Sequence, residues 1–432
     1  MAPERNFISK LPVEITSEIF TLCLPSVRSL RDFDSSQEKR VGEHIFSPPY
    51  GPTPMILSKI CRSWREISFS TPALWSTVPL DLNETPEKVL SSMEMFASIV
   101  DEWISRSHRQ PLSFIIRAEL VRETPHHPLL DSLFSAYSPR IQSLQIFSDE
   151  EVLPELEFSG SFPALREVAL QYSGFPPSAK IGILGDAIQL HKVHLLGWSV
   201  ESFFLLPWSS LTTFMGEIST MDIFRFAPGL IDATVSLTAD NPIFEHESGL
   251  VITHSTLRSL AFFSGERGFD DPSIEALEFL TLPALENLHV LQISDTEHIH
   301  DTLSAFLSRS SPPLRTLSLS FDHLPPGLKL SSLPSLQSLR LGTYGIWTDL
   351  EQQILTLLEA VSKEYLPNFE ELRFVERENP KHPKQLVDLL TRLSSASKVR
   401  PLRLICEHGS WKLQPPHNPN FPSDIVEKLT YI

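Results

Sequence analysis

Cysteine is scarce in this 432-residue chain, and long apolar runs are absent from it. Cys23, Cys61 and Cys406 are widely spaced and form no C-x-x-C pair. We therefore expect neither a disulfide framework nor a zinc site, and the pattern suits a reducing compartment. No stretch approaches the roughly 20 apolar residues that a membrane-spanning helix needs. These absences predict a cytoplasmic or nuclear protein with no membrane partner.

Basic residues are also in deficit. The chain has 36 Lys and Arg against 53 Asp and Glu, which gives a formal net charge of −17, and the basic residues do not cluster along it. Binding to a phosphate backbone needs clustered positive charge. We therefore expect no nucleic-acid partner.

The motifs of common enzymes are missing as well. The sequence contains no G-x-S-x-G elbow, no P-loop, no G-x-G-x-x-G after a predicted strand and no H-E-x-x-H. Residues 297–301 (EHIHD) form the nearest metal-like cluster, but they precede a predicted helix and are interpreted as a polar cap on an exposed loop. We expect no enzyme, no catalytic residue, no cofactor and no metal; an active site assembled from dispersed residues is the alternative.

The N-terminal part of the chain predicts three short helices. Pro12 suits a first helical position, because its missing N–H has no intrahelical partner there. Apolar residues recur at helical spacing up to Pro25. A second helix is predicted to share one apolar face among Leu57, Ile60, Trp64 and Ile67. The third is predicted to begin at Thr71–Pro72 and to carry Leu74 and Trp75. Helices this short and apolar cannot bury all their apolar side chains among themselves.

This pattern resembles the F-box, a small helical module. The matching residues are Leu11, Pro12, Glu14, Ile15, Ile19 and Phe20, then Leu57, Ile60, Cys61, Trp64, Arg65, Pro72, Leu74 and Trp75. The resemblance implies docking on a Skp-type adaptor, which links substrate receptors to a cullin scaffold in SCF-type ubiquitin ligases. A polar, Pro-rich insert at residues 26–54 separates the two halves, as in F-box-like proteins of mushroom-forming fungi.

The resemblance also implies which residues face the adaptor. They are Leu11, Pro12, Glu14, Ile15, Ile19, Phe20, Leu57, Ile60, Cys61, Trp64, Leu74 and Trp75. Leu11 and Pro12 are the strongest candidates because they lie at the helix entrance, where the chain has little else to pack against. For Trp64, direct contact with the adaptor and packing inside the module are equally compatible with the sequence.

A second pattern, L-x-x-L-x-L, recurs through the rest of the chain at intervals of roughly 20 to 30 residues. The main copies are Ile141–Ile146, Leu165–Leu170, Leu190–Leu195, Leu257–Phe262, Leu285–Val290, Leu314–Leu319, Leu336–Leu341 and Phe369–Phe374. Weaker copies lie at Leu211–Gly216, Leu230–Val235 and Leu402–Leu404. The last two apolar positions alternate with a polar one, as a strand with one buried face requires. Each copy therefore predicts a short strand.

The repeated strands resemble those of leucine-rich repeats. That resemblance implies an irregular α/β solenoid, with a parallel sheet on one side and helices on the other. A strand is also predicted at residues 112–120 after a helix ending near Ser107, and further helices are predicted at residues 129–137, 273–279, 299–308, 350–364 and 385–393. An α/β domain that merely uses Leu-rich strands is the alternative fold.

Together these patterns predict two domains. Residues 1–82 would be an F-box-like domain with the inserted loop, and residues 83–432 a leucine-rich-repeat-like domain that binds an unidentified protein substrate. The implied function is the substrate-recognition subunit of an SCF-type ubiquitin ligase. The alternative is a protein-interaction scaffold whose N-terminal helices only cap the solenoid. Trp198, Trp208, Trp347 and Trp411 are candidates for substrate contacts, with packing inside the repeats favoured for each.

Overall fold

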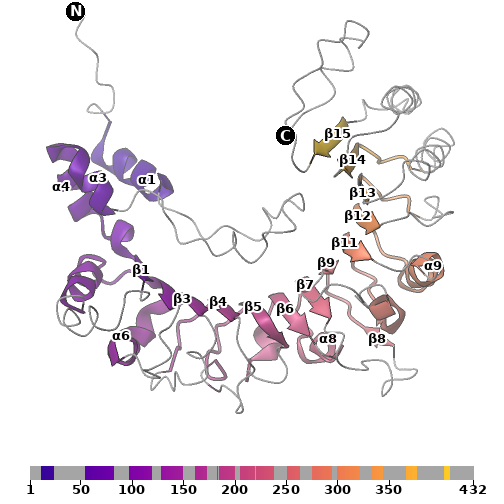
Figure 1. The fold of residues 1–432 in the computed structure, drawn as a ribbon, viewed down its shortest axis with the longest axis horizontal. Coiled ribbons are helices and arrows are strands. Elements are labelled where there is room, and N and C mark those ends of the chain that lie inside the picture. Colours follow the sequence, from indigo (N-terminus) through magenta and orange to yellow (C-terminus); the bar gives the residue numbers. More distant parts are fainter. Residues whose placement is uncertain are drawn as a thin grey trace, which may run out of the picture. The chain divides into compact units, whose positions relative to one another are not determined.

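A computed structural model of the chain describes residues 11–23, 54–81, 97–118, 128–148, 161–172, 182, 184–199, 205–218, 220–237, 251–262, 275–293, 299–321, 333–343, 366–376 and 403–408. The chain divides into two compact units, residues 1–198 with 202–210, and residues 199–201 with 211–432. Each unit combines parallel strands with helices (Figure 1). The predicted insert at residues 26–54 lies outside the described residues except for Pro54.

The first unit begins with the N-terminal helices: α1 (Val13–Cys23), α3 (Pro54–Ile60), α4 (Arg62–Ser70) and the 3₁₀ helix η4 (Pro72–Trp75). The prediction of one helix through Leu57 and Ile67 was wrong, because Cys61 adopts an extended conformation that separates α3 from α4. Its sulfur accepts a hydrogen bond from the Trp64 backbone N–H at 3.5 Å and so caps α4. The predicted third helix is a single 3₁₀ turn.

The same unit continues into a parallel sheet that follows chain order. Its strands are β1 (Thr77–Asp81), β2 (Leu112–Ala118), β3 (Ile141–Ser148), β4 (Glu167–Tyr172) and β5 (Lys192–Ser199). Strand β1 lies inside the predicted F-box range of residues 1–82, yet it pairs with β2. The N-terminal helices and the first strands therefore share one compact unit, and the predicted domain boundary at residue 82 stays a prediction.

The second unit holds another run of parallel strands in chain order. They are β6 (Thr213–Ile218), β7 (Asp232–Leu237), β9 (Ser259–Phe262), β11 (Asn287–Ile293), β12 (Thr316–Phe321), β13 (Ser338–Thr343), β14 (Glu371–Glu376) and β15 (Arg403–His408). A separate parallel pair joins β8 (Ile252–Thr253) to β10 (Leu280–Thr281). The fold is thus mixed α/β with a long, open parallel sheet. The structure confirms the predicted α/β class and the parallel arrangement of the strands.

The recurring L-x-x-L-x-L pattern corresponds to one repeated local structure. In every copy from Leu165 to Phe369, the strand starts two residues after the first apolar residue. That first residue is buried, and in most copies its N–H bonds the carbonyl three residues earlier, as Leu285 does with Leu282. The next two N–H groups then bond one carbonyl of the preceding copy, as those of Glu286 and Asn287 do with Arg258. The backbone of each copy is therefore satisfied by its neighbour.

Helices between the strands match the sequence only in part. The structure confirms α6 (Pro128–Tyr137) and α9 (Ile299–Ser310), and residues 97–106 are helical as predicted. The helix predicted at residues 273–279 is the 3₁₀ helix η8 (Glu275–Phe279). The predictions at residues 350–364 and 385–393 lie outside the described residues. Neither α8 (Ile223–Phe226) nor the turns η5 (Ser138–Arg140) and η7 (Trp208–Ser210) were predicted from the sequence.

Two buried histidines on the sheets are expected to make the stability of the fold depend on pH. Burial lowers the pKa of His194 on β5 from 6.5 to about 4, with a further lowering by Lys192 that Glu167 opposes. Burial, and then the charge of Arg340, lower the pKa of His289 on β11 to about 4. Both rings are neutral in the folded chain at pH values where the unfolded chain binds their protons. Their contribution to stability is therefore complete above about pH 6.5 and is lost as the pH falls towards about 4.

We expect the unfolding midpoint in urea to fall between about pH 7 and about pH 5, and to fall less in the His194→Gln/His289→Gln variant. The remaining decrease in that variant measures the other titrating groups. An identical pH dependence in the two proteins would show that these histidines do not contribute.

Among the described helices, none is both long enough and apolar enough to cross a bilayer. Within the same described residues, no group of three or more His, Cys, Asp or Glu side chains is arranged to hold a metal ion. The polar cluster noted in the sequence at residues 297–301 has no described side chain apart from Asp301.

Candidate docking surface

The N-terminal helices share a small apolar core. Its buried members are Phe20 of α1, Leu57 of α3, Ile67 of α4, and Leu74 and Trp75 of η4. Two half-buried tryptophans, Trp64 and Trp103, pack against them. The Phe20 and Trp64 rings lie 4.6 Å apart between centroids in a tilted arrangement. Each helix thus contributes to a core that none of them could form alone.

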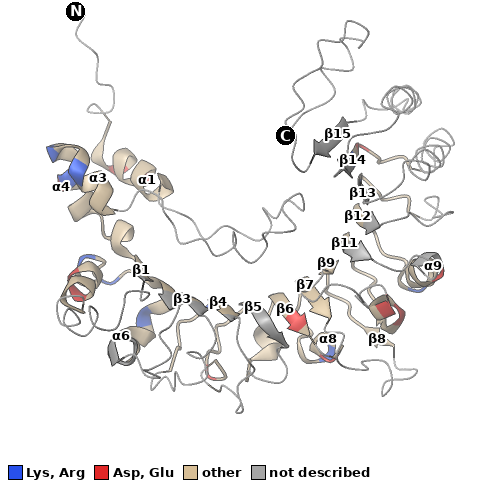
Figure 2. Ribbon diagram, in the orientation of Figure 1, with Lys and Arg blue, Asp and Glu red and all other residues tan. Residues whose placement is uncertain are grey.

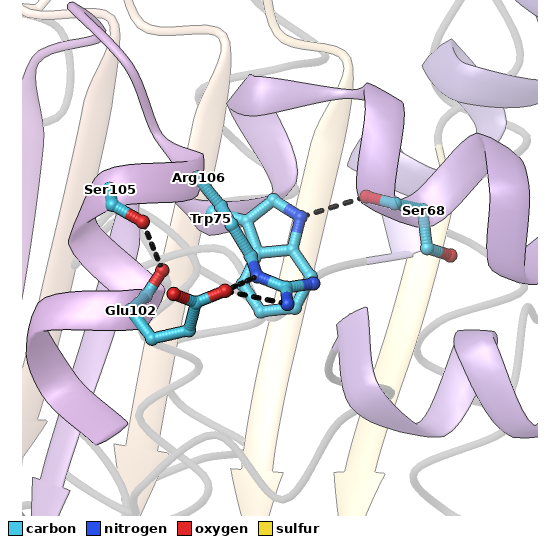
Figure 3. Close-up of polar contacts among 5 residues, drawn as sticks. All are labelled: Ser68, Trp75, Glu102, Ser105 and Arg106. Atoms are coloured by element: carbon cyan, nitrogen blue, oxygen red, sulfur yellow. Dashed lines mark hydrogen bonds and ion pairs between the residues drawn. The ribbon is translucent and has the colours of Figure 1, made fainter. Parts of the chain in front are cut away.

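Trp75 connects this core to the next helix of the chain. Its Nε1–H donates to the Ser68 carbonyl at 2.8 Å (Figure 3). Its ring packs against Trp103 in an edge-on arrangement, with 4.9 Å between the ring centroids. The Arg106 guanidinium lies 4.8 Å from the Trp75 ring and 4.3 Å from the Phe69 ring. Glu102 holds that guanidinium through hydrogen bonds of 2.8 and 3.0 Å. The 3₁₀ turn is therefore fixed on one side by α4 and on the other by residues 97–106.

Hydroxyl groups fix α1 against the end of α4. The Thr71 hydroxyl donates to the Ile67 carbonyl at 2.7 Å. Its single proton is thereby used, so the Ser17 hydroxyl, 3.0 Å away, donates to Thr71 Oγ1. Thr71 is the N-cap residue of η4, as predicted, but its side chain makes no capping hydrogen bond there. It instead joins two helices that are distant in the sequence.

One face of α1 has no partner within the described residues. The helix buries only Thr16 and Phe20. Its other apolar side chains remain exposed, and Ile15, Ile19 and Leu22 recur at intervals of four and three residues, which places them on one stripe of the helix. Leu11, also exposed, lies two residues before the helix begins and four positions ahead of Ile15. We call these four residues the α1 stripe: Leu11 (40% exposed), Ile15 (46%), Ile19 (42%) and Leu22 (80%).

Helix α3 also presents apolar side chains to solvent. Ile56 and Ile60 lie one turn apart and are exposed, as is Met55. More than half of the exposed large hydrophobic residues in the described chain lie on the N-terminal helices. Basic side chains occur on α4, where Figure 2 shows them in blue, whereas α1 carries only the acidic Glu14 and Glu18. Clustered apolar exposure of this kind marks an interaction surface.

The structure separates the predicted adaptor residues into two groups. Those exposed to solvent are Leu11, Pro12, Glu14, Ile15, Ile19, Ile60 and Cys61, while Trp64 is half-buried. Those buried in the core are Phe20, Leu57, Leu74 and Trp75. The prediction that the second group contacts a partner directly does not fit this burial. These four side chains hold the helices together and so position the exposed ones.

Several members of this surface and core were not among the predicted site residues. Val13, Leu22, Met55 and Ile56 are exposed apolar residues, and Leu22 could have been found because it continues the spacing of Ile15 and Ile19. The position of Trp103 in the core had no sequence signal beyond its place on an amphipathic helix.

The tryptophans considered as substrate contacts are mostly undescribed. Trp208 is half-buried in η7, and it is the one candidate of the four whose side chain the structure describes. Trp347 and Trp411 lie outside the described residues, and Trp198 lies in β5 without a described side chain. Comparison with protein-family models and with curated proteins gives no match to this chain.

Proposed function

We propose that this protein is the substrate-recognition subunit of an SCF-type ubiquitin ligase and that its N-terminal helices dock on a Skp-type adaptor. The observation that carries the proposal is the α1 stripe, an exposed apolar face on a helix whose opposite side is anchored by Phe20. Leaving such a face in water is unfavourable, and covering it contributes roughly 25 cal/mol per Å² of apolar surface. The F-box resemblance supplies the partner that would cover it.

The second half of the proposal concerns the repeated strands. We propose that they are irregular leucine-rich repeats and that they bind a protein substrate. The support is the two-residue offset between the first apolar residue and the strand in every copy from Leu165 to Phe369, together with the shared backbone bonds between neighbouring copies. The protein then needs no bond chemistry of its own. It accelerates ubiquitin transfer by holding a substrate lysine near the thioester of a conjugating enzyme that the cullin scaffold recruits.

The test is complex formation with the full-length chain. We expect a purified Skp-type adaptor mixed with this protein to co-elute with it in size-exclusion chromatography as a one-to-one complex. Absence of a complex at concentrations of about 10 µM would overturn the docking proposal, since interfaces of this kind bind more tightly than that. The full chain is needed because Trp103 and β1 belong to the same compact unit as the helices.

A scaffold whose N-terminal helices only cap the sheet is the second candidate. Two contacts favour it: the edge-on contact of Trp75 with Trp103 joins the N-terminal helices to the helix at residues 97–106, and β1, which follows η4 directly, pairs with β2 of the sheet. A cap buries its apolar side and turns a polar side to water. The α1 stripe instead turns apolar side chains to water. Adaptor docking explains this exposed apolar face, and capping does not.

A further inference from the structure

Helices α1 and α3 carry the same five-residue pattern with opposite charge. Residues 15–19 of α1 read Ile-Thr-Ser-Glu-Ile, and residues 56–60 of α3 read Ile-Leu-Ser-Lys-Ile. We call them the acidic and the basic pattern. Residues three and four positions apart lie on the same side of a helix, so each helix presents two isoleucines with one charged side chain beside them.

Both patterns are open to solvent. Their four isoleucines are between 42% and 56% exposed, and the charged residues Glu18 and Lys59 are exposed as well. The opposite side of each helix is held in the core of the N-terminal helices, by Phe20 in α1 and by Leu57 in α3. The two patterns of one copy therefore do not cover each other, although both helices belong to the same compact unit.

The charges decide which pairing of these helix faces is favourable. Glu14 and Glu18 are the only charged residues of α1, and Lys59 is the only one of α3. Two α1 faces placed together would oppose four carboxylates, and two α3 faces would oppose two ammonium groups. An α1 face on an α3 face instead brings Glu18 to Lys59 and covers isoleucines on both helices.

We propose that α1 of one copy of this protein packs on α3 of a second copy, and that a two-fold axis repeats the contact. In a two-fold dimer both copies use the same surface, so each copy has both of its patterns covered. Two Glu18–Lys59 pairs form, one at each contact. The symmetry also closes the assembly, so growth stops at the dimer.

The proposed interface is small. Leu11 and Leu22 extend the α1 face and Met55 extends the α3 face, so each copy contributes seven exposed apolar side chains. A standard protein interface uses about 20–30 residues on each side. The dimer therefore belongs to the weak class, with an expected dissociation constant of roughly 10 µM.

The dimer regulates the proposed docking, because both use the α1 stripe. An adaptor that covers Ile15 and Ile19 displaces the second copy, and the second copy keeps these side chains out of water while no adaptor is bound. This consequence rests on the proposed function, whereas the self-association itself requires no adaptor.

The test is sedimentation velocity of the full chain alone, from about 1 µM to about 200 µM, a range that brackets the expected dissociation constant. We expect the average mass to rise from the 48.8 kDa of one copy to twice that value and no further. A protein that stays monomeric over this range, or that assembles beyond a dimer, would overturn the proposal.

Charge reversal identifies the surface. Glu18→Lys and Lys59→Glu should each weaken the dimer by roughly tenfold, because each change makes two attractive contacts repulsive. The double variant restores two pairs of opposite charge and should dimerise nearly as well as the unaltered protein. Asp186→Lys, a reversal at an exposed residue of the first unit outside the N-terminal helices, is the matched control and should have no effect. Single reversals without effect, or a double variant that does not recover, would overturn the pairing of α1 with α3.

A last measurement separates this proposal from adaptor docking. An excess of Skp-type adaptor is expected to convert the dimer into complexes that contain one copy of each chain. Complexes that hold two copies of this protein and two adaptors would overturn the shared use of α1. Dimers that form while no adaptor binds would overturn the docking proposal alone.

Discussion

Replacement of Trp75 by Ala is expected to lower the free energy of unfolding of the first unit by about 4 kcal/mol, a typical loss when a large aromatic residue in a core is replaced by Ala. Trp75 is 2% exposed, packs on Trp103 and donates to the Ser68 carbonyl. Removing it leaves a cavity and an unpaired carbonyl, and it also removes the surface on which Arg106 stacks. Such a loss is a large fraction of the stability of most domains.

The measurement is urea unfolding followed by circular dichroism, with the transition of the first unit analysed separately because a chain with two units need not unfold in one step. Trp75→Phe is the informative companion, since it keeps an aromatic ring but cannot donate to Ser68. We expect it to lose about 1–2 kcal/mol. Phe69→Ala removes a ring that is 40% exposed and should cost less than Trp75→Ala. An Ala variant as stable as the original protein would contradict the central role of Trp75.

The second large effect is expected at the α1 stripe. We expect Ile15→Glu/Ile19→Glu to weaken binding of the Skp-type adaptor by at least about a hundredfold, because central apolar residues carry most of the energy of such interfaces and a carboxylate buried there has no partner. Both isoleucines are more than two-fifths exposed, so stability should change by no more than about 1 kcal/mol. Binding is measured by isothermal titration calorimetry with the full chain, and stability by thermal unfolding.

The matched control is Ile188→Glu, the same change at an isoleucine that is 74% exposed and lies outside the N-terminal helices. It should bind the adaptor with unchanged affinity. The Leu11→Ala/Pro12→Ala variant tests the helix entrance and is expected to weaken binding by a smaller factor, since it removes apolar surface without adding charge. If the double Glu variant still binds tightly while remaining folded, the adaptor does not use the α1 stripe.

Of all parts of the fold, the repeated strands were the easiest to predict from the sequence. Residues Leu285, Leu288 and Val290 show why: alternation with polar residues is a local property, and it predicts both a strand and its buried face. Helices were harder, because η8 and η4 are 3₁₀ turns although their sequences are compatible with α-helix. The break at Cys61 was missed because the apolar spacing from Leu57 to Ile67 continues through it.

The candidate site was predicted less completely than the fold. The sequence identified Ile15, Ile19, Phe20 and Trp75 as one set of apolar residues. It could not divide them into exposed and buried residues, because that division depends on what each side chain meets. Phe20 is buried because it packs on Trp64, which lies more than forty positions later in the chain, whereas nothing described covers Ile19.

By itself, then, the sequence determined the local structure: it predicted strands from two-residue alternation and helix starts at prolines. It also showed that the common catalytic motifs are absent. The strands and helix starts follow from short-range sterics and hydrogen bonding, which a few neighbouring residues specify. Only the tertiary structure decided which face of α1 is left for a partner, and only it left the matching isoleucines Ile56 and Ile60 of α3 exposed. Both depend on contacts between residues that are distant in the chain, and the spacing of residues along it does not specify such contacts.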